Sequence, residues 1–200
     1  VVISMRKTLW HTIRHPIADV KFRYLVFASI PTAIIAVLVK LFVSEELMYN
    51  LLPIGFAVSI VLIVLSDRLS KPTLRLSDSG VLPVLVTGAV QGVAVFPGLS
   101  RSGSTISVMK LFGINGTDSA EFSFLLSIPI ILASAAVETY EVIKAGVTIN
   151  WLCVAVGTTA AFVSGLASVY LVMRAIKNKS WIWFAVYLVV PLTISLIVLF

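Results

Sequence analysis

The sequence has 200 residues, of which 59% are apolar and 12% charged, whereas about 25% of residues are charged in an average soluble domain. Too few polar side chains remain to cover a soluble globular surface, which excludes an ordinary soluble domain and predicts a single membrane domain over residues 1–200. The net charge is +6, and eleven of the fifteen lysine and arginine residues lie in three short stretches, residues 6–23, 67–79 and 174–179. Such clusters between apolar runs are typical of the cytoplasmic loops of membrane proteins and argue against nucleic acid as a partner.

Five apolar stretches dominate the chain. A helix needs about 20 apolar residues to cross the hydrocarbon core of a bilayer, and four stretches reach that length while one, over 122–138, is shorter. In chain order the stretches are residues 24–43, 48–66, 122–138, 151–173 and 181–200. We therefore predict an all-α integral membrane protein with about five transmembrane helices.

Residues 82–112 differ from these stretches because a polar, glycine-containing segment interrupts them. The apolar pieces 84–96 and 105–112 are each too short to span. If the basic stretches are cytoplasmic, the acidic loops 44–48 and 138–150 lie outside, and the count of crossings closes only if 82–112 enters and leaves on one side. We therefore predict a re-entrant helical hairpin, since irregular backbone at membrane depth is tolerated only where it is buried in protein or lines a wet cavity.

Arg101 lies in the tip of this predicted hairpin, among hydroxyl and glycine residues. An arginine at membrane depth is costly and indicates a functional site, and its planar guanidinium suits bidentate capture of a phosphate. The neighbours that could donate hydrogen bonds or allow close approach are Gly98, Ser100, Ser102, Gly103, Ser104 and Thr105. Ser104 or Thr105 could cap the second half-helix, whose N-terminus would then attract an anion. The alternative is a polar surface loop in which Arg101 contacts lipid headgroups.

Residues 91–105 read Q-G-V-A-V-F-P-G-L-S-R-S-G-S-T and resemble the second signature, P-G-x-S-R-S-x-x-T, of the bacterial undecaprenyl-diphosphate phosphatases, the bacitracin-resistance family. Residues 120–129, A-E-F-S-F-L-L-S-I-P, are similar to the family's A-x-F-S-F-L-L-x-I-P stretch. Residues 28–33 and 181–200 resemble the segment after the family's first repeat and its final helix. The resemblance extends over essentially the whole chain.

This resemblance implies a helical protein of the bacterial inner membrane, built from two inverted repeats that each contribute one re-entrant hairpin to a shared site. It also implies hydrolysis of a polyprenyl diphosphate lipid to the monophosphate plus phosphate, which recycles the lipid carrier for peptidoglycan synthesis in the cell wall and is connected with bacitracin resistance and cell shape. By matching positions, Arg101 and Ser100 would be catalytic. The substrate would be bound by Gln91, Gly98, Ser102, Gly103, Ser104 and Thr105.

The family's first signature, E-G-x-x-E-[FW]-L-P-[VI]-S-S-x-G-H, is absent from the sequence. In the family it supplies the paired glutamates that bind a divalent cation, and Gln91 and Val95 stand at the corresponding positions of the repeat present here. We therefore expect no metal ligand in this chain, and a preceding segment, before Val1, whose glutamates hold Mg²⁺ or Ca²⁺. The chain would then represent half of the inverted-repeat architecture.

Two other functions are compatible with the sequence. Broken helices that meet at the bilayer midplane are also a transporter architecture, so the protein could move a phosphorylated lipid or an anion across the membrane. It could instead be an inactive half-protein that needs a partner to supply the missing hairpin, and a homo-oligomer is also compatible with the sequence. Outside the hairpin, we expect His11 and His15 to be loop residues rather than a metal site. Glu121 would either contact the site or pair with Asp118 at a helix start.

Overall fold

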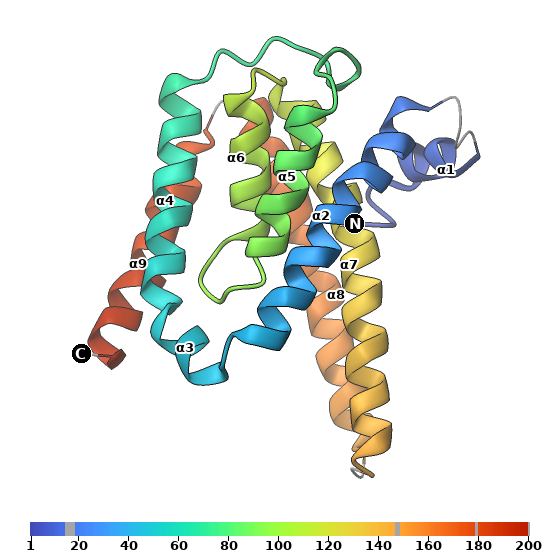
Figure 1. The fold of residues 1–200 in the computed structure, drawn as a ribbon, viewed down its shortest axis with the longest axis vertical. Helices are drawn as coiled ribbons and strands as arrows, with labels where there is room; N and C mark the ends of the chain where they lie inside the picture. Colours follow the sequence, from blue (N-terminus) through green and yellow to red (C-terminus); the bar gives the residue numbers. More distant parts are fainter. Residues whose placement is uncertain (15–18, 147–148, 179, 200) are drawn as a thin grey trace.

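The computed structural model describes residues 1–14, 19–146, 149–178 and 180–199, and every regular element in these ranges is a helix (Figure 1). In chain order the elements are α1 (Arg6–Arg14), α2 (Val20–Phe42), α3 (Glu45–Asn50), α4 (Leu52–Leu69), the short 3-10 helix η1 (Leu76–Asp78), α5 (Leu82–Val93), α6 (Arg101–Leu111), α7 (Gly116–Lys144), α8 (Trp151–Lys177) and α9 (Ile182–Leu199). The predicted all-α fold is therefore confirmed.

Five helices are long and apolar enough to cross a membrane, as predicted, and they are α2, α4, α7, α8 and α9. The prediction of a loop over 138–150 is wrong for residues 138–144, because α7 continues to Lys144. Glutamate and lysine are good helix formers, and Glu141 Oε1 lies 2.8 Å from Lys40 Nζ, so the end of α7 is tied to α2. The loop predicted over 44–48 likewise contains α3, whose N-terminus is capped by Ser44.

Helices α5 and α6 form the predicted hairpin. With 12 and 11 residues at about 1.5 Å per residue, each is roughly 17 Å long, little more than half of a 30 Å hydrocarbon core. The two helices lie side by side, and the start of α5 is at the same end of the molecule as the end of α6 (Figure 1). The connecting turn contains Gly98 at a φ of +80°, a conformation that glycine adopts at little cost.

The hairpin is enclosed by longer helices on several sides. Helix α5 packs against α2, while α6 packs against α4 and α7 (Figure 1). The α2–α5 contact brings the two backbones together, since a Cβ on Gly88 would lie 2.1 Å from the carbonyl oxygen of Ala28. Thr32 Oγ1 of α2 also donates a hydrogen bond of 2.7 Å to the carbonyl oxygen of Gly88. These contacts fix where α5 begins and ends relative to α2, and so position the tip of the hairpin.

Candidate functional site

The first turn of α6 forms the tip of the hairpin, and Ser100 caps it. Ser100 has an extended backbone, with φ of −66° and ψ of 107°, and its side chain accepts a hydrogen bond of 3.1 Å from the N–H of Gly103. The prediction that Ser104 or Thr105 caps this helix is therefore wrong. Gly98 reverses the chain only two residues earlier, so the helix begins as soon as an extended residue with a capping hydroxyl follows the turn.

Among the described residues, two backbone donors at the start of α6 have no acceptor. The N–H of Gly103 is bonded to the cap hydroxyl and the N–H of Ser104 to the Ser100 carbonyl oxygen. Within the residues that the structure describes, the N–H groups of Arg101 and Ser102 have no such partner. Free N–H groups and the positive end of the helix dipole favour an anion at this position.

Arg101 is half-buried at the same helix end. Among the described residues its guanidinium makes no hydrogen bond and no ion pair, while the four ion pairs that are present involve other side chains. A half-buried guanidinium without a carboxylate partner is costly unless an anion compensates its charge. The predicted phosphate-binding residue therefore lies beside two free backbone donors.

The other predicted hydroxyl and glycine residues of this turn lie deeper. Ser102 is half-buried, but Gly103, Ser104 and Thr105 are buried, the last two with no exposed surface. Thr105 Oγ1 donates to the carbonyl oxygen of Arg101 at 2.9 Å and lies 2.6 Å from Ser123 Oγ of α7. Ser104 Oγ has no hydrogen-bond partner among the described residues. Their predicted roles in substrate binding stay predictions, and in this arrangement Thr105 fastens the turn to α7.

Gln91 lies apart from this cluster, near the end of α5. Its Nε2 donates a hydrogen bond of 3.0 Å to the carbonyl oxygen of Leu126 in α7. Pro129 interrupts the hydrogen bonding of α7 close by, because proline has no N–H. Gln91 Oε1 is buried and has no partner in the part of the chain that the structure describes. Gln91 thus joins the two helices, and its predicted contact with substrate stays a prediction.

Sequence reasoning did not identify Ser59 of α4, on which the tip rests. Ser59 Oγ accepts a hydrogen bond of 2.8 Å from the N–H of Ser100, although the two residues are 41 positions apart. The available signal was the small pair Gly55 and Ser59, one helical turn apart in an apolar helix, a spacing that allows close helix contact in membranes.

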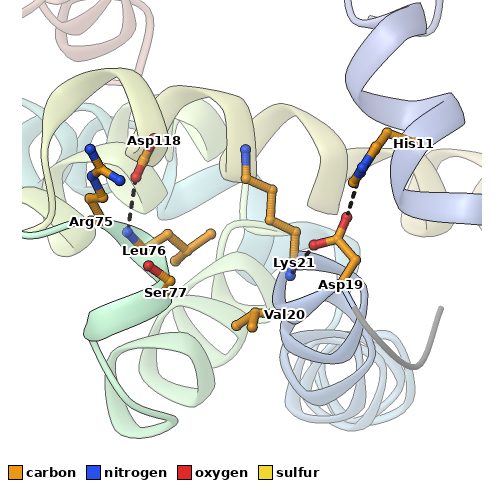
Figure 2. A pocket seen from close by; sticks show the side chains of 8 residues that line it. All are labelled: His11, Asp19, Val20, Lys21, Arg75, Leu76, Ser77 and Asp118. Atoms are coloured by element: carbon orange, nitrogen blue, oxygen red, sulfur yellow. Dashed lines mark hydrogen bonds and ion pairs between the residues drawn. The ribbon is translucent and has the colours of Figure 1, made fainter. Parts of the chain in front are cut away.

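A cavity of about 500 Å³ lies away from the hairpin tip. Its walls come from α1, the start of α2, η1 and the start of α7 (Figure 2), at the opposite end of α5, and it is lined by His11, Asp19, Val20, Lys21, Arg75, Leu76, Ser77 and Asp118. Among its lining residues, His11 Nδ1 lies 3.5 Å from Asp19 Oδ2, Lys21 Nζ lies 3.0 Å from Glu121 Oε2, and Asp118 accepts from the N–H of Leu76. A smaller groove of about 210 Å³ adjoins the tip and is lined by Leu51, Ile54, Gly55, Val58, Val93, Phe96 and Leu99.

The remaining predicted candidates lie away from the tip. Glu121 pairs with Lys21 of α2 at 3.0 Å rather than with Asp118, and it contacts no residue of the hairpin turn among the hydrogen bonds and ion pairs of the described residues. His11, predicted to be a loop residue, lies instead in helix α1, while His15 falls outside the described residues. Across the ranges that are described, there is no group of three or more histidine, cysteine, aspartate or glutamate side chains that could hold a metal ion.

Comparison with known proteins agrees with the signature at the tip. The sequence matches the family "Bacitracin resistance protein BacA" over residues 1–193. A protein named undecaprenyl-diphosphatase from Syntrophotalea carbinolica is 37% identical over 166 residues, which are 82% of this chain and 63% of the relative. A protein of the same name from Treponema denticola is 34% identical over 176 residues, 88% of this chain and 64% of the relative.

The chain thus spans less than two thirds of the length of these two relatives. The family match nevertheless covers nearly all of its own 200 residues, including both arms of the hairpin and the turn that carries Arg101. The multi-pass helical fold agrees with a membrane protein. The chain belongs to the bacitracin resistance protein BacA family.

Proposed function

We propose that this protein takes part in the hydrolysis of undecaprenyl or a similar polyprenyl diphosphate to the monophosphate and inorganic phosphate. Relatives that share 37% and 34% of their aligned residues with it are named undecaprenyl-diphosphatase. We further propose that it acts in the bacterial inner membrane, where this hydrolysis returns the lipid carrier to cell-wall synthesis.

The observation that carries the proposal is Arg101, a half-buried guanidinium without a partner among the described residues, at a helix end with two free N–H groups. In the reaction a water oxygen bonds to the terminal phosphorus, the phosphoanhydride P–O bond breaks, and a proton of the water passes to the departing phosphates or to solvent. Negative charge on the phosphate oxygens is stabilised by the guanidinium fork and the N–H groups. Arg101 would hold and orient the diphosphate, and the half-buried Ser102 follows it directly in the turn.

The apolar groove beside the tip supports a lipid substrate rather than a soluble diphosphate. Its lining is almost entirely aliphatic or aromatic, and Leu99 of this lining is two residues from Arg101. Two side chains of α4 that face the groove, Ile54 and Val58, are exposed. A diphosphate at the tip would therefore leave its prenyl chain against an apolar surface.

We also propose a divalent cation, Mg²⁺ or Ca²⁺, with ligands in a segment outside residues 1–200. The described residues do not fit such an ion, since they offer no group of three or more metal-ligating side chains, and the residues predicted at the tip, within 98–105, are all cationic or neutral. We therefore assign to this chain only the holding of the phosphates, and no step of the reaction that depends on the metal.

The test is phosphate release by the full-length protein, purified in detergent and also reconstituted in vesicles, with polyprenyl diphosphate as substrate. We expect phosphate release that requires a divalent cation and is abolished by a chelator. Movement of labelled lipid diphosphate across the vesicle membrane without phosphate release would contradict hydrolysis and favour a transporter. Release that begins only after a second protein is added would indicate a half-protein that needs a partner.

A further inference from the structure

The tip of the hairpin rests on one turn of α4, formed by Gly55 and Ser59. Ser59 is completely buried. Its hydroxyl donates to the carbonyl oxygen of Gly55 at 2.9 Å and accepts from the N–H of Ser100 at 2.8 Å. Ser59 is therefore the acceptor for the backbone of the residue that caps α6.

The backbones of α4 and the turn are in direct contact around this hydrogen bond. A Cβ on Gly55 would lie 2.4 Å from the carbonyl oxygen of Pro97 and 2.7 Å from the nitrogen of Leu99. A Cβ on Gly98 would lie 2.2 Å from the carbonyl oxygen of Leu52. Contacts this short leave no room for a side chain at Gly55 or Gly98, so the close approach of α4 and the turn requires glycine at both positions.

The Ser59 hydrogen bond determines which backbone donors remain free at the tip. The N–H of the cap residue has no acceptor inside its own helix, and a buried N–H without an acceptor costs free energy. Without Ser59, the turn would relax until Ser100 found water or another carbonyl oxygen. That movement would shift the cap hydroxyl away from Gly103 and change the direction of the N–H groups of Arg101 and Ser102.

We infer that Ser59 is a positioning residue for phosphate binding, which acts through Ser100 and does not touch the substrate. This inference rests on the proposed function, because it assigns to Ser59 the orientation of the same diphosphate site. Ser59 lies on α4 and outside the signature that carries Arg101.

Ser66 provides a matched control on the same helix. It is also completely buried, and its hydroxyl lies 3.0 Å from Ser107 Oγ in the middle of α6 and donates to the carbonyl oxygen of Ile63. Like Ser59, it links α4 to α6 through a hydroxyl, but it lies two helical turns from the tip. A general loss of stability should affect Ser59→Ala and Ser66→Ala similarly, while a loss of positioning should affect only Ser59→Ala.

The experiment compares wild type, Ser59→Ala and Ser66→Ala in the full-length protein. For each we would measure the Kd for a non-hydrolysable short-chain prenyl diphosphate analogue in the presence of Mg²⁺, the KM and kcat for phosphate release from the prenyl diphosphate itself, and the thermal midpoint. Loss of one neutral hydrogen bond predicts a Kd roughly three- to tenfold weaker for Ser59→Ala. We expect the Kd of Ser66→Ala to stay within about twofold of wild type, with a similar fall in thermal midpoint for both variants.

A double-mutant cycle separates positioning from an independent contribution. If Ser59 acts by orienting the turn, its effect on Kd should become smaller in an Arg101→Lys background, because the turn positions the guanidinium together with the N–H groups and the guanidinium has already been removed. Equal Kd values for Ser59→Ala and Ser66→Ala would overturn the inference. If wild type binds the diphosphate but releases no phosphate, hydrolysis is rejected while the Kd comparison still tests Ser59. If wild type does not bind it at all, both proposals fail.

Discussion

Helices α6 and α8 show opposite relations between sequence and burial. In α6, eight of eleven residues are buried, including three serine and threonine residues and Lys110. In α8, only Val169 of 27 residues is buried, although α8 is among the helices apolar enough to cross a membrane. The segment with the polar side chains is enclosed by protein, and the apolar segment is exposed.

This arrangement is the reverse of a soluble protein and fits a chain whose surroundings are lipid. Apolar side chains on α8 need no cover in a bilayer, whereas the backbone and hydroxyl groups of a short helix with an irregular turn must be satisfied inside the protein. In Figure 1, α7 and α8 extend past the hairpin turn, while α5 and α6 lie between α2 and α4. We therefore expect the functional site in the enclosed hairpin of α5 and α6, and we assign the exposed helix α8 as a membrane span.

The same substitution at an arginine of each region should have very different effects on activity. We expect Arg101→Lys to lower the rate of phosphate release by about a hundredfold or more, because lysine lacks the bidentate fork and the transition-state charge loses its donors. Arg174→Lys, in the last turn of α8 where Arg174 is exposed, should leave the rate unchanged. Phosphate release measured on both full-length variants, with size-exclusion profiles to confirm folding, checks this. Near-normal release by Arg101→Lys would contradict bidentate binding.

Replacing a glycine with alanine should destabilise the protein in the enclosed region but not in α8. A Cβ on Gly88 would meet the carbonyl oxygen of Ala28 at 2.1 Å, whereas nothing lies within 4 Å of a Cβ on Gly157 of α8. Overpacking predicts that Gly88→Ala loses about 3 kcal/mol of unfolding free energy, and helix propensity predicts that Gly157→Ala is neutral or gains about 0.5 kcal/mol. Unfolding in detergent followed by circular dichroism measures both. Equal stability of the two variants would show that α2 and α5 do not pack this closely.

Tryptophans allow a finer comparison. Trp181 is 2% exposed, and its Nε1 donates to Ser107 Oγ of α6 at 3.4 Å, whereas Trp183 is 67% exposed. We expect Trp181→Phe to cost about 1 to 2 kcal/mol of unfolding free energy, from the lost hydrogen bond and the smaller ring. Trp183→Phe should change it by less than about 0.5 kcal/mol. If both changes have the same effect, the contact between Trp181 and Ser107 of α6 does not stabilise the protein.

The smallest effect is expected at Asp19, which caps α2. Burial alone would raise the pKa of its carboxyl, but the hydrogen bond from the N–H of Lys21 and the interaction with His11 outweigh it and lower the pKa. The resulting stability is present above the unfolded carboxyl's pKa of about 4 and is lost as the pH falls through the lower pKa of the folded state. When the pH is lowered from 6 into the acidic range, the thermal midpoint of Asp19→Asn should therefore fall slightly less than that of wild type. The difference should correspond to about 0.5 kcal/mol of unfolding free energy. Identical pH profiles would contradict this contribution.

Hydropathy predicted the five long helices because burial in lipid depends on composition over a length that sequence reveals directly. The prediction failed where charged residues were interpreted as a loop. The charges over 138–150 looked like a loop, yet α7 continues through Glu141, because glutamate is a good helix former, and Glu141 pairs with Lys40 of α2. That pairing depends on the distance between two helices, which the sequence does not contain.

The candidate site could be predicted in part. The signature around Arg101 placed the hydroxyl and glycine residues in one turn, and the structure brings them together at the hairpin tip. The cap could not be assigned, because Ser100, Ser104 and Thr105 all have suitable side chains and only the position of the reversal at Gly98 decides between them. Ser59 could not be assigned to the tip because its spacing from Gly55 indicates a close contact of α4 but not which segment makes that contact.

The most direct test of the central claim is a structure of the full-length protein with a non-hydrolysable polyprenyl diphosphate analogue. We predict that a phosphate group lies about 3 Å from the Arg101 guanidinium and the N–H of Ser102, with the prenyl chain against the groove beside the tip. A phosphate bound instead in the cavity at the other end of α5 (Figure 2), beside Lys21 and Arg75, would contradict the assignment of the hairpin tip as the diphosphate site.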